Sequence, residues 1–405
     1  MNAESLEKFL RIFLPSFLVT AWLITVALAV DKCRAHDSWI MGDWLINYHG
    51  GFTRRGLTGE IAIGLARITS LNVGSVVVIL QSLCYGIYFA FSYLLLRKTS
   101  LLPYAMLIVS PFIFSFQIND SSYGFKKEII YFALLAFLAW SKCSLRRDLF
   151  EKIFFTALPL YALAILSHEM LILFVPYLFI LYIIDTKPSR KRCGLVVLGL
   201  LPALAGFLFA VHFKGTPTQT IAIYDVLTSM NYVIPKDGGG IGWLGATTQS
   251  GINAVRENLS GDALYLPAAA LAWVAFIPLH NTLRLLFADK GVAILFLFSL
   301  AGTIILAIVA FDWGRFIYIH LVSLFILVLV TGQIWPELEK VRQQSVVSPL
   351  TVFLILIWAL AFYIPGSAYG QPDIIIKSIE NINYFRPAYH FYQRRTGASP
   401  LVLSP

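Results

Sequence analysis

Charged residues are scarce in this sequence: Asp, Glu, Lys and Arg make up only 13% of its 405 residues, against about 25% in soluble domains. Cysteine is also rare. The four cysteines, at positions 33, 84, 143 and 193, form no CxxC pair, which argues against a zinc site and a disulfide framework. The sequence also has no internal repeat, which counts against the repeat-based transporter folds.

Hydrophobic residues are in excess, at 58% of the chain, with a mean hydropathy of +0.75. Apolar runs of roughly 17–22 residues recur along the whole length, as α-helices that cross a bilayer require. The runs are continuous rather than alternating, so a β-barrel is disfavoured. We therefore predict an all-α, polytopic transmembrane helical bundle.

About eleven spans are predicted, in one bundle over residues 1–365, followed by a C-terminal tail over 366–405. The first apolar stretch is too long for the h-region of a signal peptide, so we interpret it as an uncleaved first helix. The spans are placed at 11–30, 74–96, 101–118, 128–141, 153–166, 169–185, 193–212, 263–280, 291–310, 316–333 and 349–365.

The distribution of basic residues predicts which side of the membrane each loop occupies. With the N-terminus inside, the inner segments hold about 16 of the 31 lysines and arginines in roughly 55 residues, as the positive-inside rule expects. We therefore predict an N-in, C-out topology. The net charge of +9 then reflects cytoplasmic loops and bilayer surfaces, and no nucleic acid partner is expected.

This topology brings four polar motifs to the outer face. They lie at 43–60 in the outer loop 31–73, at 119–128, at 167–169 and at 312–315. A second long outer loop, 213–262, includes the sequence PKDGGGIGWLG, which is read either as a lid with a glycine hinge or as a plain flexible loop. Residues 57–68 have the apolar spacing of an interfacial helix.

Arg54 and Arg55 stand between glycines in the sequence GGFTRRGL. The planar guanidinium binds phosphate bidentately, and flanking glycines permit close backbone approach. The pair therefore predicts a phosphate or diphosphate site, with binding of lipid headgroups as the alternative.

Lys126 and Lys127 precede Glu128 at the start of the fourth predicted span. The dipole of a helix opposes basic residues at its N-terminus, whereas an anion bound there is favoured. The two lysines are therefore predicted to bind the same anion, and snorkelling toward the interface is the alternative.

His168 and Glu169 separate two apolar runs with almost no loop between them. Ionisable residues at such depth usually have a function. Glu169 is a candidate general base, with His168 orienting it or binding phosphate; a helix cap is the alternative. No second histidine lies at ligand spacing, so no metal site is predicted.

Asp312 and Arg315 lie in FDWGRF at the junction of two spans. At positions i and i+3 they share a helix face and can pair. Either the pair is a structural salt bridge, or Arg315 reaches the anion while Asp312 holds the arginine or acts as a base. Asp43, beyond the first span, is a further candidate base, as is Asp37 in principle; a solvated loop is the alternative for both.

Taken in order, GGFTRRGL, the KKE turn, HE and DWGR resemble the Wzy-type polymerases of bacterial O-antigen and capsule clusters, which are similar in design to the GT-C membrane glycosyltransferases. The resemblance implies a GT-C-like fold in the bacterial inner membrane. It also implies undecaprenyl-diphosphate-linked oligosaccharide substrates at the periplasmic face, and a chain-length regulator protein as a further partner.

The sequence thus predicts a glycosyltransferase that polymerises repeat units. A carboxylate among Asp43, Glu169 and Asp312 would deprotonate the acceptor hydroxyl. The catalytic group would also include His168. Charge on the departing diphosphate would be stabilised by five cations, so that no cofactor is required; they are Arg54, Arg55, Lys126, Lys127 and Arg315.

Two other functions remain open at this point. A flippase or transporter of a lipid-linked or anionic substrate would bind near the midplane, usually between repeats. An acyl- or phospho-group transferase would need a nucleophile or metal constellation that the sequence does not display.

Overall fold

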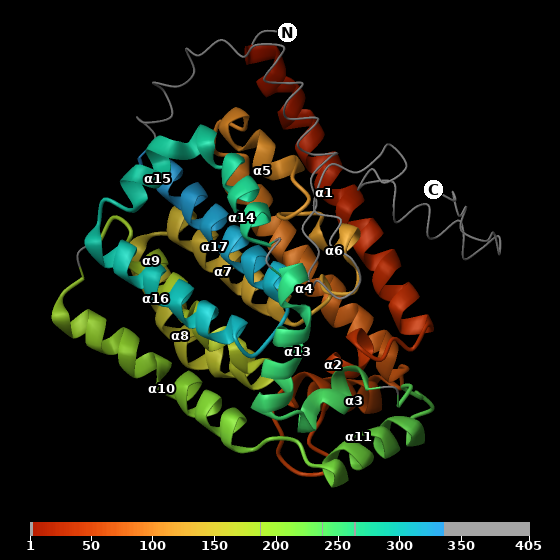
Figure 1. Ribbon diagram of the computed structural model, residues 1–405. Coiled ribbons are helices and arrows are strands. Elements are labelled where there is room, and N and C mark those ends of the chain that lie inside the picture. Colours follow the sequence, from red (N-terminus) through yellow and green to blue (C-terminus); the bar gives the residue numbers. More distant parts are fainter. Residues whose placement is uncertain (1–2, 187, 237, 263–264, 336–405) are drawn as a thin grey trace.

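The computed structural model describes residues 3–186, 188–236, 238–262 and 265–335, and this part of the chain is helical without any strand (Figure 1). Six of its helices are long and apolar enough to cross a membrane. They are α1 (Ala3–Arg34), α4 (Val73–Leu96), α8 (Arg147–Ser167), α10 (Arg190–His212), α16 (Lys290–Ala307) and α17 (Trp313–Ile334). The all-α class is confirmed, with six candidate membrane-spanning helices in the described residues, whereas the count of eleven stays a prediction.

The shorter helices connect these six and cover their ends. They are α2 (Ile40–Trp44), α3 (Leu57–Thr69), η1 (Leu102–Tyr104), α5 (Ala105–Val109), α6 (Phe116–Asn119), α7 (Glu128–Ser144), η2 (Glu169–Phe174), α9 (Val175–Ile183), α11 (Pro217–Ser229), α12 (Gly239–Gly242), η3 (Trp243–Gly245), α13 (Thr248–Asp262), α14 (Tyr265–Val274), η4 (Ile277–Leu279) and α15 (His280–Leu286). The helix expected near residues 57–68 is thus present as α3.

Several helices begin where side chains can cap them. The Asn72 side chain accepts a hydrogen bond from the amide of Gly74 at the start of α4. Asp289 accepts from two amides at the start of α16. At α11, Thr216 and Gln219 form a reciprocal capping box. These caps satisfy amides that would otherwise lack a partner, so the sequence fixes these boundaries locally.

The predicted span at 101–118 is not one helix, and that prediction was wrong. Here α5 ends at Val109 and α6 begins only at Phe116. The residue that follows α5, Ser110, is extended, with φ −66° and ψ 151°, because Pro111 comes next and disfavours the helical conformation at the residue before it.

Two other predicted spans change conformation part-way. Residues 169–185 begin as the 3₁₀ helix η2 and continue as α9. In 263–280, the helix α14 ends at Val274 and η4 follows. The last predicted span at 349–365 and the tail at 366–405 lie outside the described residues.

Each long helix packs against neighbouring helices of the bundle. Helix α4 packs between α1 and α7, α8 packs against α10, and α17 packs against α7. Helix α17 is the most buried of the six. Helices α2, α3 and α11 lie at the lower end of the bundle in Figure 1.

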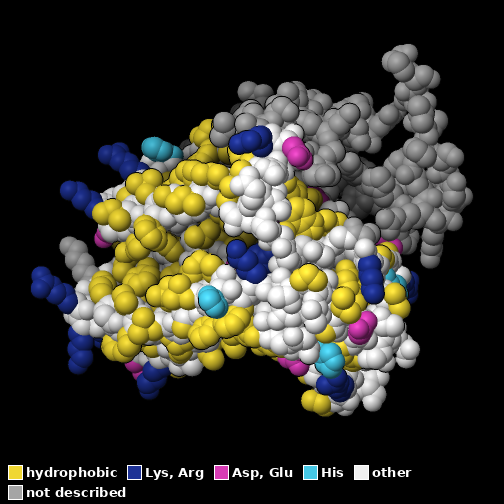
Figure 2. Space-filling view, turned by 60° about the horizontal axis from the view of Figure 1, so that its bottom comes forward, with side chains coloured by type: hydrophobic (Ala, Val, Ile, Leu, Met, Phe, Trp, Pro, Cys, Tyr) yellow, Lys and Arg dark blue, Asp and Glu magenta, His cyan; other side chains and the backbone are white. Residues whose placement is uncertain are grey.

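The outer surfaces of the long helices are strongly apolar. Large exposed side chains include Leu198, Leu204 and Leu208 on α10, and Ile294 and Phe298 on α16. Figure 2 shows hydrophobic side chains gathered over one side of the molecule, with Lys and Arg at one edge. Such a surface is expected where lipid, not water, surrounds the helices.

Candidate functional site

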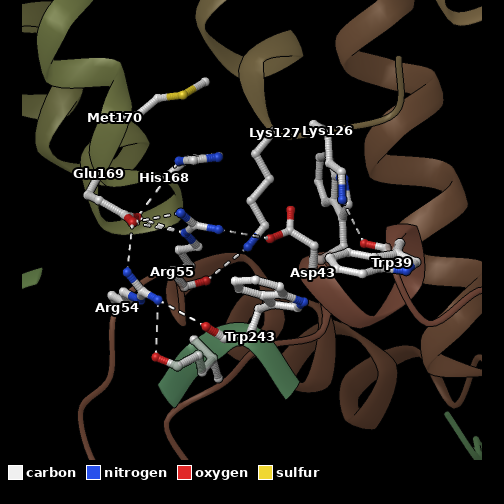
Figure 3. Close-up of polar contacts among 12 residues, drawn as sticks. Trp39, Asp43, Arg54, Arg55, Lys126, Lys127, His168, Glu169, Met170 and Trp243 are labelled. Atoms are coloured by element: carbon white, nitrogen blue, oxygen red, sulfur yellow. Dashed lines mark hydrogen bonds and ion pairs between the residues drawn. The ribbon is translucent and has the colours of Figure 1, made fainter. Parts of the chain in front are cut away.

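The four polar motifs form one buried cluster, and Figure 3 shows the part of it around Arg55 and Glu169. The structure brings together all nine residues selected from the sequence and adds Glu128 to them. The connected residues are Asp43, Arg54, Arg55, Lys126, Lys127, Glu128, His168, Glu169, Asp312 and Arg315. We call this set the charged cluster.

Arg55 and Glu169 form a two-pronged ion pair in the charged cluster. Nε and Nη2 of Arg55 donate to the Glu169 carboxylate over 2.8–3.0 Å. This fork is the geometry in which arginine also binds phosphate. A protein carboxylate therefore occupies the binding face of this guanidinium.

The backbone at Arg55 is held in an unusual conformation. Its φ of +65° lies in the left-handed region, which costs of order 1–3 kcal/mol for a residue other than glycine. The ammonium of Lys127 donates to the Arg55 carbonyl over 3.0 Å. Gly56 is required next to it, since a Cβ there would come within 2.2 Å of the Tyr48 ring. The RRG sequence thus turns the arginine toward the cluster.

Arg54 is held by backbone carbonyls from a distant loop. Its Nη2 donates to the carbonyls of Trp243 and Leu244 over 3.0 and 3.1 Å, and its Nη1 lies 3.7 Å from Glu169. Its Nε is buried without a hydrogen-bond partner. The guanidinium therefore retains an unsatisfied donor within the charged cluster.

Asp43 is a buried carboxylate surrounded by cations. Its Oδ1 lies 3.9 Å from Nη1 of Arg55, and its Oδ2 is buried without a hydrogen-bond partner. Burial alone would raise its pKa, but Lys127, Lys126 and Arg55 together lower the pKa below its usual value. Asp43 is therefore ionised, and it offsets part of the positive charge around it.

The charges of two lysines, Lys126 and Lys127, act on Asp43, but neither ammonium forms a close ion pair with it. Lys126 donates to the Trp39 carbonyl over 2.9 Å and lies 5.7 Å above the Trp39 ring. Within the described ranges, neither Lys126 nor Lys127 has a carboxylate oxygen within 4.0 Å. Burial lowers the pKa of Lys127 to about 8, against the opposing effect of Asp43. An incoming anion would favour the charged form of both lysines.

Arg315 connects the other half of the cluster. It pairs with Glu128 and, over 2.6 Å, with Asp312, so the i, i+3 pairing predicted from FDWGRF is confirmed. Its Nη2 lies 2.8 Å from Nε2 of His168. Because arginine can only donate, that nitrogen must accept.

His168 is therefore uncharged in the charged cluster. Burial lowers its pKa well below the ordinary value, and the positive charges of Arg55 and Arg315 lower it further. Its Nδ1 then carries the proton, and that atom is buried without a hydrogen-bond partner, 3.7 Å from Glu169. A neutral histidine here orients Arg315 rather than supplying positive charge.

A cavity of about 520 Å³ opens beside the charged cluster. Its polar end includes the side chains of Arg54, Arg55, Lys214 and Arg315, together with two carboxylates, Glu169 and Asp312. Four cations against two anions give this end a net positive charge. The opposite wall is apolar and is formed by α10 and α16, including Phe207 and Ile305.

Two tryptophans line the same cavity. The rings of Trp39 and Trp243 lie 6.3 Å apart and are inclined by 38°. Trp39 is 45% exposed. Exposed indole faces offer a flat, weakly polar surface on which the C–H face of a sugar ring can stack.

The triple glycine of the 213–262 loop packs tightly against α2. A Cβ at Gly240 would lie 2.5 Å from the amide nitrogen of Asp43, and the Gly240 amide donates to the Ser38 carbonyl over 2.8 Å. The glycines therefore allow close backbone contact over Asp43, which is a third interpretation beside the lid and the flexible loop.

Asp37, the other carboxylate after the first helix, has a local role. Its Oδ1 accepts hydrogen bonds from the amides of Trp39 and Ile40, and its Oδ2 pairs with Lys32 over 2.9 Å. These contacts order the turn that leads into α2. Asp37 thus positions the helix that presents Asp43.

Sequence reasoning missed three residues that line the cavity: Trp39, Trp243 and Lys214. Trp243 lies three residues after the triple glycine, so the requirement for close packing there was the signal that could have found it. Nothing in the sequence marks Trp39 or Lys214 as a cavity residue, because tryptophan and lysine are common wherever a helix ends at a membrane surface.

Comparisons with known proteins add no relative: no protein family, no curated protein and no solved structure matches this chain. In the described part of the chain, no group of three or more His, Cys, Asp or Glu side chains is arranged to hold a metal ion.

Proposed function

We propose that the protein is a GT-C-like membrane glycosyltransferase that acts on undecaprenyl-diphosphate-linked glycans at the outer face of the bacterial inner membrane. The observation that carries this proposal is the cavity, which combines a positively charged end with an apolar wall between two lipid-exposed helices. A ligand that fits both parts has an anionic head and a hydrocarbon chain. The N-in, C-out topology with about eleven spans belongs to the same proposal.

The donor diphosphate would bind at the positive end of the cavity. Arg54 and Arg55 both line it, and the fork of Arg55 that now holds Glu169 matches a phosphate oxygen pair. Such preorganised charge stabilises the diphosphate as it leaves.

Asp312 is the carboxylate that we place as general base. It lines the cavity and its side chain is 23% exposed, whereas the Asp43 side chain is 4% exposed. Glu169 also lines the cavity, but both its oxygens accept from Arg55. In this scheme, Glu169 and Asp43 are counter-ions that position the arginines.

The reaction would be one direct displacement. The acceptor hydroxyl gives its proton to Asp312, its oxygen bonds to the anomeric carbon, and the bond from that carbon to the diphosphate breaks. The lipid diphosphate leaves with the electron pair, and the configuration at the anomeric carbon inverts. General-base assistance contributes about 10²–10⁴-fold.

The experiment is glycan length analysis in a deletion strain complemented with single variants. We expect Arg54→Ala and Arg55→Ala each to abolish long glycans and leave one-repeat products, while the protein still reaches the membrane. Arg256→Ala is the matched control, because that arginine is exposed on α13 and lies outside the cavity. If both cluster variants still polymerise, the diphosphate assignment is wrong. Accumulation of inward-facing lipid-linked units in the deletion strain would instead indicate a flippase.

A further inference from the structure

A second apolar groove lies on the protein surface next to the charged cluster. It has a volume of about 650 Å³ and runs between α3, α4, α7 and α8. Its lining includes Ile61 of α3, Cys84 of α4, Leu134 of α7 and Ala157 of α8. It shares no lining residue with the cavity between α10 and α16. We call it the α7–α8 groove.

The α7–α8 groove follows the membrane-spanning direction. Its lining on α8 extends from Lys152 to Ser167, which at 1.5 Å per residue is roughly 22 Å. The hydrocarbon core of a bilayer is about 30 Å thick. The groove therefore has the length and the chemistry to hold an extended hydrocarbon chain rather than a compact solute.

The outer end of the groove reaches the charged cluster. Trp44, Thr58 and Ser167 line that end; Trp44 follows Asp43 in the chain, and Ser167 precedes His168. Trp44 is almost fully buried and donates to the Phe125 carbonyl over 2.7 Å. A single layer of residues thus separates the groove from the cluster.

The lining residues on α7 lead toward Lys127 at the N-terminal cap of that helix. Ile130, Leu134 and Phe137 line the groove, and Lys127 lies three residues before Ile130, at the N-terminal cap of α7. Residues at i and i+3 share a helix face. Lys127 therefore lies at the outer end of this lining, and its ammonium donates to the Arg55 carbonyl in the charged cluster, with no carboxylate within 4.0 Å in the described ranges.

We propose that the α7–α8 groove binds the polyprenyl chain of a second lipid-linked substrate, the acceptor, with its phosphate directed toward Lys127. This inference rests on the proposed function and adds a substrate class to it. Two apolar routes reach one charged cluster from different sides, as a transferase that joins two lipid-linked glycans requires. The acceptor keeps its phosphate bond, and only the donor in the other cavity loses its glycan.

The first test is photo-labelling of the full-length protein in nanodiscs of phosphatidylethanolamine and phosphatidylglycerol. The probe is undecaprenyl phosphate with a diazirine in its chain. We expect labelled peptides from α7 and α8, with labelling reduced about tenfold by excess undecaprenyl phosphate but unchanged by added phosphatidylglycerol. Absence of label from α7 and α8 overturns the proposal. Equal competition by phosphatidylglycerol also overturns it, since the groove would then be a site for bulk phospholipid.

The second test blocks the groove. Ala157→Trp places an indole in it and should lower long glycans and α7–α8 labelling by at least about tenfold. Ala205→Trp is the matched control, because Ala205 is exposed on α10 and lines neither cavity; it should change both by less than about twofold. Normal labelling or normal glycans in a membrane-inserted Ala157→Trp variant contradicts the proposal.

The two proposals can fail separately. If the deletion strain still makes long glycans while α7 and α8 remain labelled, the glycosyltransferase proposal fails and binding of a polyprenyl chain in the groove stands. If Arg55→Ala abolishes long glycans but α7 and α8 are never labelled, the groove assignment fails and the glycosyltransferase proposal stands.

Discussion

Glu169→Gln is the perturbation whose outcome the structure defines most closely. The substitution keeps the shape of the side chain but removes the charge that faces Arg55 at 2.8 Å and Arg54 at 3.7 Å. Breaking a fully buried pair costs about 3–5 kcal/mol. Here the Arg55 and Glu169 side chains are 28% and 13% exposed, so solvent screening reduces the expected loss to about 2–3 kcal/mol.

The loss can be measured as a fall in Tm. An unfolding entropy of about 2.1 cal/mol/K per residue converts that loss to roughly 3 °C for a chain of 405 residues. The assay is recovery of detergent-solubilised protein by size-exclusion chromatography after heating. Glu257→Gln is the control, since Glu257 is exposed on α13, and it should leave Tm unchanged.

A second measurement ties this pair to anion binding. With Glu169 neutral, Arg55 is free for phosphate, so undecaprenyl phosphate should stabilise the variant more than the wild type. At a ligand concentration of about 100 Kd the gain is about 2.7 kcal/mol, which restores most of the lost Tm. If Glu169→Gln has the same Tm as the wild type, the ion pair between Arg55 and Glu169 does not stabilise the protein as we infer. An equal ligand effect in both proteins would refute competition between Glu169 and phosphate.

Two further predictions concern Lys127 and the triple glycine. Binding of undecaprenyl phosphate should weaken as pH rises through about 8, because the Lys127 ammonium, whose pKa burial has lowered to about 8, loses its proton there; a flat titration of Kd between about pH 6.5 and 9.5 contradicts this. The free energy of unfolding should change with pH in the opposite direction to ligand binding. Because the pKa of Lys127 is lower in the folded protein than in the unfolded chain, its contribution to stability rises as pH increases above about 8. Gly240→Ala should lower both Tm and glycan synthesis, because its Cβ would lie 2.5 Å from the Asp43 amide nitrogen. Gly242→Ala is the control and should change neither, because a Cβ there would have no atom within 4 Å. Equal behaviour of the two variants in these assays would rule out the packing role of Gly240.

Most of the membrane helices could be predicted from hydropathy alone, because spanning a bilayer requires a long apolar run wherever the helix packs. One predicted span was wrong because a local backbone constraint interrupts a segment that is apolar enough to cross a membrane. The run at 101–118 is apolar enough to span, but Pro111 breaks it, and the backbone at Ser110 is extended. Hydropathy averages over such a residue, whereas backbone geometry does not.

The residues of the charged cluster were also identifiable from the sequence, because each is an ionisable group at a depth where charge is costly. Their arrangement was not. Arg55 could have paired with any nearby carboxylate, and it is Glu169, 114 residues away, that satisfies it. Arg315 similarly selects Glu128 across 187 residues.

What the sequence by itself determined is therefore the class of the protein and the short list of polar residues that a membrane would not tolerate without a purpose. The tertiary structure decided which of them face a cavity and which only balance charge. Asp312 and Asp43 look equivalent in the sequence, yet the first lines the cavity and the second is enclosed by cations. The physical reason is that burial and partner choice depend on helix packing, and packing is decided by contacts between segments far apart in the chain.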